Sequence, residues 1–187
     1  MIAAARHIAL TDRKVREGGW FHKKGIELYG KTLGVVGLGA IGQAVARVGK
    51  ALGMRVLGWS FRRDEERARG CGVELVALDD LLRQADVVSL HLRASAQANG
   101  IIGRRELSLM KRSAILVNTA RGALVDEGAL VEALREGRIF AAGLDVYGRE
   151  PLPADSPLRG LDNVVLMPHA GWITDNAYKR LMEVPVE

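Results

Sequence analysis

The sequence predicts an α/β protein in which a doubly wound parallel sheet lies between two layers of helices. From Lys31 onward, short apolar runs alternate with segments of helical periodicity. The runs are continuous and mostly β-branched, as expected for strands buried on both faces, and they comprise residues 33–36, 55–59, 87–90, 114–117, 141–144 and 164–166. The helices predicted between them are 41–52, 78–84, 104–110 and 126–136.

Length and composition narrow the class of protein further. The 187 residues favour one domain, and a hydrophobic content of 48% excludes disorder. No apolar run approaches the roughly 18 residues that span a membrane, and the single cysteine, Cys71, cannot form an internal disulfide. We therefore expect a cytoplasmic protein without a membrane partner. Because the basic residues behind the net charge of +5 are scattered, we expect a solvated surface and no nucleic-acid partner.

A glycine-rich sequence, Gly37-Leu38-Gly39-Ala40-Ile41-Gly42, follows the first predicted strand and opens a helix. In this context the first glycine permits a tight turn, the second lets the backbone approach a pyrophosphate, and the third lets helix and strand pack closely. The pattern predicts a Rossmann-like dinucleotide site, with free N–H groups at the start of the helix facing the anion. The alternative is a glycine-rich turn that binds no ligand.

In dinucleotide-binding folds, the residue after the second strand helps to distinguish NAD from NADP, and here that strand is the predicted run 55–59. An acidic residue at this point would accept the ribose 2′-hydroxyl, but Ser60 stands here, followed by Arg62 and Arg63. A small hydroxyl with nearby arginines suits a 2′-phosphate, so we expect NAD(P) binding with NADP favoured over NAD. Alternatively, the arginines only solvate the next helix, and Asp64 is a weak substitute for the missing acid.

Three charged residues follow later predicted strands, at the carboxyl edge of the sheet where such folds bind ligands. Arg121 can hold a carboxylate through two hydrogen bonds, His169 can donate or accept a proton near neutral pH, and Glu150 can orient the imidazole. Together they suit the reduction of a 2-keto acid. Taken singly, each has an ordinary alternative: a surface-turn arginine, a loop ion-pair glutamate and a structural histidine.

The segments 117–126, 143–151 and 168–174, with the glycine-rich loop, closely resemble the D-isomer-specific 2-hydroxyacid dehydrogenases. That family includes phosphoglycerate dehydrogenases, glyoxylate/hydroxypyruvate reductases and D-lactate dehydrogenases, and the resemblance covers about residues 1 to 180. It implies hydride transfer between a nicotinamide cofactor and a small D-2-hydroxy or 2-keto acid, with no metal. Arg121 would bind the substrate carboxylate, His169 would be the acid/base, and Glu150 would be its partner.

The resemblance also implies a set of cofactor-binding residues. Asp145 would bind the nicotinamide carboxamide, and Thr119 and Ala120 would contact the cofactor nearby. The remaining positions are Gly37, Gly39, Ala40, Ile41, Gly42, Ser60, Arg62, Arg63, His91, Leu92, Arg121, His169 and Gly171. Two departures matter: Arg93 replaces the proline that the family commonly has, and Ser60 resembles the NADP-preferring reductases. Glu150 disfavours formate, because formate dehydrogenases have glutamine there.

The family pattern predicts three parts in this chain. Residues 1–17 are expected to form one amphipathic crossing helix, apolar at Ile2, Ile8 and Val15, that serves as a dimer arm. Residues 18–174 would form the dinucleotide-binding domain, and 175–187 would begin a return helix. We therefore expect a homodimer from which the substrate domain is largely absent. The alternatives are a non-catalytic dinucleotide-binding and dimerisation module and a corepressor-like relative.

Overall fold

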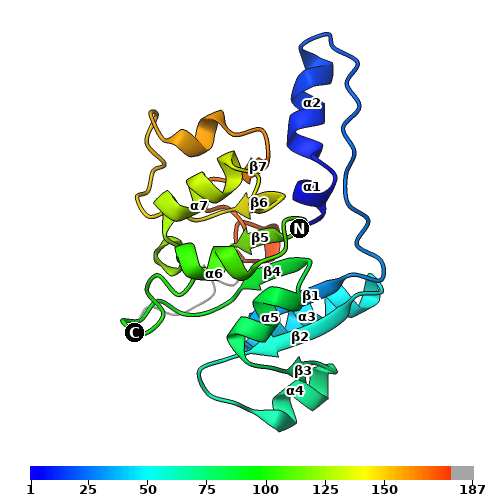
Figure 1. Ribbon diagram of the computed structural model, residues 1–187, viewed down its shortest axis with the longest axis vertical. Helices are drawn as coiled ribbons and strands as arrows, with labels where there is room; N and C mark the ends of the chain where they lie inside the picture. Colours follow the sequence, from blue (N-terminus) through cyan, green and yellow to red (C-terminus); the bar gives the residue numbers. More distant parts are fainter. Residues whose placement is uncertain (178–187) are drawn as a thin grey trace.

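The computed structural model describes residues 1–177 and contains one seven-stranded sheet with all neighbouring strands parallel (Figure 1). The order is β3-β2-β1-β4-β5-β6-β7, so the chain reverses direction across the sheet between β3 and β4. The strands are β1 (Thr32–Val36), β2 (Arg55–Trp59), β3 (Glu74–Leu75), β4 (Val87–Leu90), β5 (Ile115–Asn118), β6 (Ala141–Leu144) and β7 (Val164–Leu166). The predicted doubly wound parallel sheet is confirmed.

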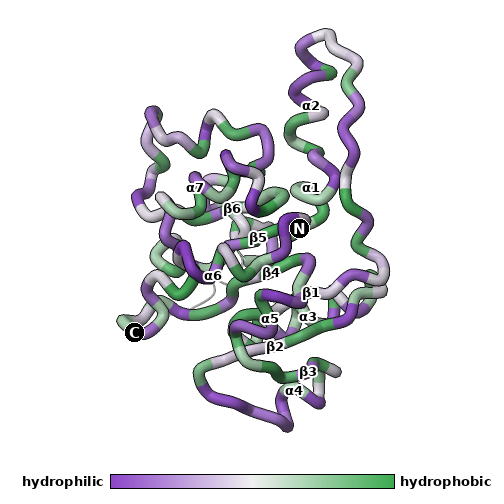
Figure 2. Tube along the Cα trace, in the orientation of Figure 1, coloured by the Kyte–Doolittle hydropathy of each residue, from purple (hydrophilic) through white to green (hydrophobic). Residues whose placement is uncertain are grey.

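Helices cover both faces of the sheet and give the expected three layers. They are α1 (Ile2–Ala5), α2 (Ile8–Arg16), α3 (Ala40–Ala51), α4 (Glu65–Cys71), α5 (Leu78–Gln84), α6 (Arg104–Leu109) and α7 (Glu127–Arg135), with 3-10 turns at Gly122–Leu124 and Pro157–Gly160. Alternate residues along the strands enter two separate apolar cores. In β5, Leu116 joins the core under α5–α7, whereas Ile115 and Val117 join the core under α1, α3 and α4. Figure 2 shows the resulting hydrophobic centre of the molecule.

Two elements of the structure, α4 and β3, were not predicted. The segment is short and highly charged, so apolar periodicity gives no signal for it. Local hydrogen bonds define it instead: the Asp64 carboxylate accepts the Arg67 N–H (2.9 Å) as an N-cap, and Gly72 ends the helix at φ +64°.

The prediction of one amphipathic helix over residues 1–17 is wrong. The helix breaks after Ala5, whose carbonyl accepts the Ile26 N–H (2.8 Å), and His7 takes φ +51° before α2 begins. A tertiary hydrogen bond therefore replaces a helical one. The predicted apolar face is also exposed: Ile2, Ile8 and Val15 are 50%, 49% and 49% exposed. The buried side is made by other residues, namely Ala4, Ala5, His7 and Leu10.

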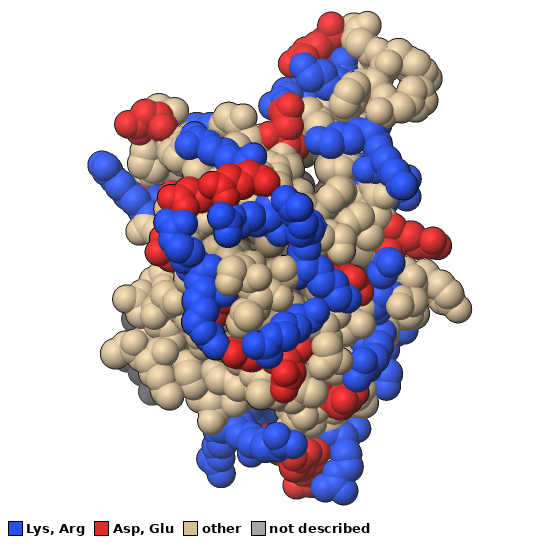
Figure 3. Space-filling model, in the orientation of Figure 1, with Lys and Arg blue, Asp and Glu red and all other residues tan. Residues whose placement is uncertain are grey.

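Charged side chains of both signs mix on the surface. Figure 3 shows acidic groups lying among the basic ones, and several form ion pairs, such as Arg105 with Asp79 and Lys111 with Asp86. Within residues 1–177, no helix combines the length and apolar character that a membrane crossing needs.

The close approach of α3 to β1 gives a first prediction. A Cβ on Gly42 would lie 1.9 Å from the Gly37 carbonyl oxygen, which is backbone and cannot yield cheaply. We expect Gly42→Ala to destabilise the fold by about 1–3 kcal/mol, the range for overpacking a tight site. The matched control is Gly70→Ala within α4, where no atom lies within 4 Å of the new methyl group.

In urea denaturation, the control should be neutral or stabilising by up to about 1 kcal/mol, because alanine is the better helix former. Equal stabilities of the two variants would contradict the packing described for the glycine-rich loop.

Candidate cofactor and active site

The glycine-rich loop links β1 to α3 at the carboxyl edge of the sheet. Gly37 takes φ +102° and donates its N–H to the Trp59 carbonyl (2.7 Å), which ties the loop to the end of β2. A Cβ on Gly39, by contrast, would meet no atom within 4 Å, so this position is open to a ligand. Gly39 caps α3 without a side-chain hydrogen bond, which leaves the first-turn N–H groups at Ala40 and Ile41 for an anion.

Ser60, at the end of β2, binds the same loop from the side. Its hydroxyl oxygen accepts the Leu38 N–H at 2.8 Å, so the hydroxyl proton is still available to a ligand. Asp64 is not free to replace the missing acid, because its carboxylate caps α4 and pairs with the Arg67 guanidinium (3.3 Å). The carboxylate closest in sequence to Ser60 is therefore already paired, as the predicted preference for NADP requires.

A cavity of about 170 Å³ lies beside the loop and gathers several predicted cofactor residues: Gly37, Gly39, Ser60, Arg62, His91 and Leu92. Arg63 was expected here too, but it pairs with Glu65 (2.6 Å) and does not line the cavity. His91 Nε2 lies 2.9 Å from the Ser89 hydroxyl, and burial lowers the His91 pKa to about 4. His91 is therefore neutral at pH 7.

Arg121 lies three residues beyond β5 and is held by the buried amide of Asn118. The Asn118 Nδ2 donates to the Arg121 carbonyl (2.9 Å), and its Oδ1 accepts the Ala120 N–H (3.1 Å). The exposed Arg121 guanidinium donates to the Ala120 carbonyl (2.6 Å). Thr119, in the same turn, is exposed. Asn118 thus fixes the backbone from which the predicted carboxylate-binding arginine projects.

The Asp145 carboxylate fixes the loop that carries His169. Asp145 is 5% exposed, and its two oxygens accept the N–H groups of Ala170 and Gly171, both at 2.8 Å. A Cβ on Gly171 would approach Asp145 to 2.8 Å, so the contact needs glycine there. His169 takes φ +54°, a conformation that costs free energy for any residue except glycine, and these two charge-assisted hydrogen bonds offset that cost.

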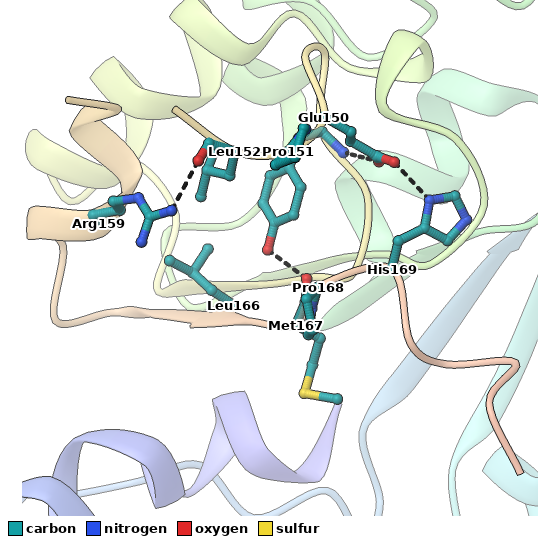
Figure 4. A pocket seen from close by; sticks show the side chains of 9 residues that line it. Glu150, Pro151, Leu152, Arg159, Leu166, Met167, Pro168 and His169 are labelled. Carbon is teal, nitrogen blue, oxygen red and sulfur yellow. Dashed lines mark hydrogen bonds and ion pairs between the residues drawn. The ribbon is translucent and has the colours of Figure 1, made fainter. Parts of the chain in front are cut away.

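The imidazole of His169 pairs with the carboxylate of Glu150 across a 2.7 Å contact from Nδ1 to Oε2 (Figure 4). The second carboxylate oxygen accepts the Tyr147 N–H at 2.9 Å. The hydrogen bond from His169, followed by that from Tyr147, lowers the pKa of Glu150. An ionised Glu150 accepts the Nδ1 proton, which leaves Nε2 as the nitrogen that can exchange a proton with a ligand.

A larger cavity of about 640 Å³ adjoins this pair, lined by Tyr147, Pro151, Leu152, Leu166 and Met167 among others (Figure 4). The Tyr147 hydroxyl donates to the Met167 carbonyl (2.7 Å), and this bond joins the end of β7 to the turn after β6. His169 and Glu150 lie at the rim of the cavity, with side chains 41% and 36% exposed.

Many of the predicted residues thus fall into two groups, the cofactor cavity and the His169–Glu150 pair, whereas Thr119, Ala120 and Arg121, on the turn after β5, line neither cavity. Sequence reasoning missed Asn118, Tyr147 and Arg67. Asn118 could have been found as a polar side chain ending an apolar run. Arg67 could have been found from its spacing of three residues after the capping Asp64.

Comparison with known proteins identifies the family. The family model for the "D-isomer specific 2-hydroxyacid dehydrogenase, NAD binding domain" matches residues 1–171. A glyoxylate reductase of Korarchaeum cryptofilum is 47% identical over 193 residues, which cover 100% of this chain and 58% of that protein. A D-3-phosphoglycerate dehydrogenase of Methanocaldococcus jannaschii is 50% identical over 182 residues, covering 96% of this chain and 34% of that one.

The solved structures agree. The crystal structure of a glyoxylate reductase from Paecilomyes thermophila matches with a TM-score of 0.91 and 39% identity, over 97% of this chain and 56% of that one. This chain therefore spans a little more than half the length of the two glyoxylate reductases and about a third of the D-3-phosphoglycerate dehydrogenase. By sequence and by fold, the chain belongs to the D-isomer-specific 2-hydroxyacid dehydrogenase family, and residues 1–171 correspond to its NAD-binding domain.

Proposed function

We propose that this chain contributes the cofactor and acid/base half of an enzyme that interconverts a small 2-keto acid and its D-2-hydroxy acid. The observation that carries the proposal is the 2.7 Å contact between His169 and Glu150 at the same sheet edge as the open glycine-rich loop. The left-handed conformation of His169, held by the buried Asp145, also supports the proposal, because strained backbone of this kind gathers at functional sites.

The charged residues divide the chemistry between them. A bound reduced nicotinamide would supply the hydride to the carbonyl carbon. His169 donates the proton from Nε2 to the carbonyl oxygen, so that the keto acid gains one hydride and one proton. Glu150 fixes the imidazole tautomer and stabilises the protonated ring, and Arg121 holds the substrate carboxylate. The Asp145 carboxylate has lone pairs beyond those used by its two backbone hydrogen bonds, and it would accept a hydrogen bond from the nicotinamide carboxamide.

The residues present fit a dinucleotide, and they favour NADP over NAD. The open space at Gly39 and the free start of α3 suit a pyrophosphate. Ser60 and Arg62 line the adjoining cavity, while the one carboxylate there, Asp64, is already paired. The one carboxylate that could accept a hydrogen bond from a 2′-hydroxyl is thus already used within the protein, whereas a 2′-phosphate would find donors in Arg62 and the Ser60 hydroxyl.

The substrate class follows from the site and from the relatives. The names glyoxylate reductase and D-3-phosphoglycerate dehydrogenase both describe enzymes of small hydroxy or keto acids. Glu150 supports the proton donor that a keto acid requires, because its carboxylate would stabilise the protonated form of His169. One observation favours the alternative of a non-catalytic dinucleotide-binding module: the His169 side chain is 41% exposed, and an open site leaves electrostatic interactions weak.

Substitution of His169 separates these alternatives. We expect the 187-residue chain to reduce glyoxylate or hydroxypyruvate, and His169→Ala to lower kcat/KM by at least about 100-fold, the lower limit for loss of a general acid. Calorimetry on the same variant should give an NADPH affinity within about twofold of the wild type, and tighter binding of NADPH than of NADH in both proteins.

Wild-type NADPH binding without turnover would favour the non-catalytic module. A large loss of NADPH affinity in His169→Ala would contradict the assigned role, and equal affinities for the two cofactors would remove the proposed preference for NADP.

We further propose that residues 1–17 form the arm of a cytoplasmic homodimer and that residues 18–174 form the dinucleotide-binding domain, whose first residues, including Trp20 and Phe21, extend the interface that the arm begins. The arm projects from the body of the molecule (Figure 1) and exposes large apolar side chains: Ile8 (49%), Val15 (49%), Trp20 (84%) and Phe21 (44%). Such a cluster on a projecting element marks a protein interface. Residues 178–187, most of the predicted return helix, lie outside the described residues.

The dimer proposal predicts that Trp20 is an anchor of the interface. We expect Trp20→Ser to raise the dimer dissociation constant by about 30-fold or more, as for a buried aromatic hot spot of about 2 kcal/mol. The control is Val48→Ser, which replaces an exposed apolar residue outside the arm: Val48 lies in α3 and is 55% exposed. Sedimentation velocity measures both. A monomeric wild type, or equal effects of the two variants, would contradict the assignment of the arm.

A further inference from the structure

Three arginines from three separate elements line the cavity beside the glycine-rich loop. Arg62 follows β2, Arg67 lies in α4, and Arg93 follows β4. Because β2 and β4 pair with opposite sides of β1, Arg62 and Arg93 approach the loop from its two flanks. The segment carrying Arg93 packs directly on the loop, since a Cβ on Gly37 would lie 2.8 Å from the His91 backbone and 3.0 Å from the Leu92 side chain.

The three arginines differ in how their charge is used. Arg67 pairs with Asp64 (3.3 Å) and reaches the Leu38 carbonyl (3.5 Å). Arg62 and Arg93 are exposed, and neither has an ion pair or hydrogen bond with any residue from 1 to 177. The guanidinium groups of Arg62 and Arg93 are therefore free to bind a ligand in the cavity that the glycine-rich loop also lines.

The charge of the cavity lining matches that of a phosphate monoester. Arg62, Arg67 and Arg93 contribute three positive charges and Asp64 one negative charge, which leaves +2. His91 also lines the cavity but is neutral at pH 7, because burial lowers its pKa to about 4. A phosphate monoester carries about −1.5 to −2 at pH 7. The pyrophosphate at the glycine-rich loop would share this charge, but a ribose hydroxyl would bring no charge to the unpaired guanidinium groups of Arg62 and Arg93.

We propose that Arg93 is a specificity-determining residue that binds the 2′-phosphate of the cofactor from the β4 side, opposite Arg62. This inference rests on the proposed preference for NADP. It adds a residue that follows β4, whereas the choice between NAD and NADP is usually made by residues at the end of β2. Arg62 and Arg93 donate to the phosphate oxygens from two sides, and the Ser60 hydroxyl proton is available for a third hydrogen bond. Arg67 stays with Asp64 and neutralises that carboxylate.

Two nucleotides that differ only in the 2′-phosphate test the proposal: adenosine 2′,5′-bisphosphate and adenosine 5′-monophosphate. Calorimetry on the 187-residue chain would measure their dissociation constants for the wild type, Arg93→Gln, Arg62→Gln and the control Arg69→Gln. Arg69 is exposed on α4 and does not line the cavity. We expect Arg93→Gln to weaken the bisphosphate about tenfold, as for loss of a charge-assisted hydrogen bond, and the monophosphate by less than about twofold.

The control variant should bind both nucleotides like the wild type. An equal loss for both nucleotides in Arg93→Gln would overturn the proposal, because Arg93 would then contact the adenosine that they share. No loss in Arg93→Gln, with a wild type that prefers the bisphosphate, would overturn the role of Arg93 alone. A wild type with no preference between the two nucleotides would overturn both this role and the NADP preference.

Discussion

The parallel direction of all seven strands is the constraint on which the site depends. Every strand delivers its carboxyl end to one edge, so loops that are far apart in the sequence meet there. Gly37 follows β1, Ser60 follows β2, His91 follows β4, Arg121 follows β5 and His169 follows β7. Each of these residues lies within three positions of its strand end, where the hydrogen bonds between buried strands fix the backbone. An antiparallel strand at any of these places would carry its functional residue to the opposite edge.

Hydrogen bonds behind the functional side chains turn this proximity into a defined geometry. The side chains that orient the site are themselves anchored: Asn118 binds the turn of Arg121, and Asp145 binds the loop of His169. Glu150 is held through the Tyr147 N–H, and the Tyr147 hydroxyl binds the end of β7. The ionised form of Glu150 is favoured by hydrogen bonds from His169 and Tyr147, which lower its pKa. Structural and chemical roles are therefore shared by the same few polar groups.

Much of this architecture follows from apolar periodicity. The predicted helix 78–84 coincides with α5, and the predicted strands 55–59, 87–90, 141–144 and 164–166 coincide with β2, β4, β6 and β7. Each of these elements is specified by its own residues, because burial of a strand or of a helix face requires the matching pattern. Their chemistry and their places after strands grouped Arg121, Glu150 and His169, the family resemblance assigned each a role, and the structure shows the last two in contact.

The remaining features depend on contacts between distant segments. The N-terminal helix breaks because Ile26 takes the Ala5 carbonyl, and no pattern within residues 1–17 encodes that bond. Arg63 was expected at the cofactor, but it pairs with its near neighbour Glu65 and only Arg62 lines the cavity, a choice that the two adjacent arginines do not reveal in the sequence. Arg93 joins the cavity because β4 lies beside β1, which is a property of the sheet order.

The central claim is that one sheet edge unites a dinucleotide site with a proton donor for a keto acid. Following the transferred hydride with an isotope label tests this claim most directly. NADPH deuterated at the transferred position would be incubated with hydroxypyruvate and the 187-residue chain, and the product examined by NMR spectroscopy for its label and by chiral chromatography for its configuration. The account predicts deuterium at C2 of a D-2-hydroxy acid. An unlabelled or L-configured product, or no product from a chain that binds NADPH, would contradict it.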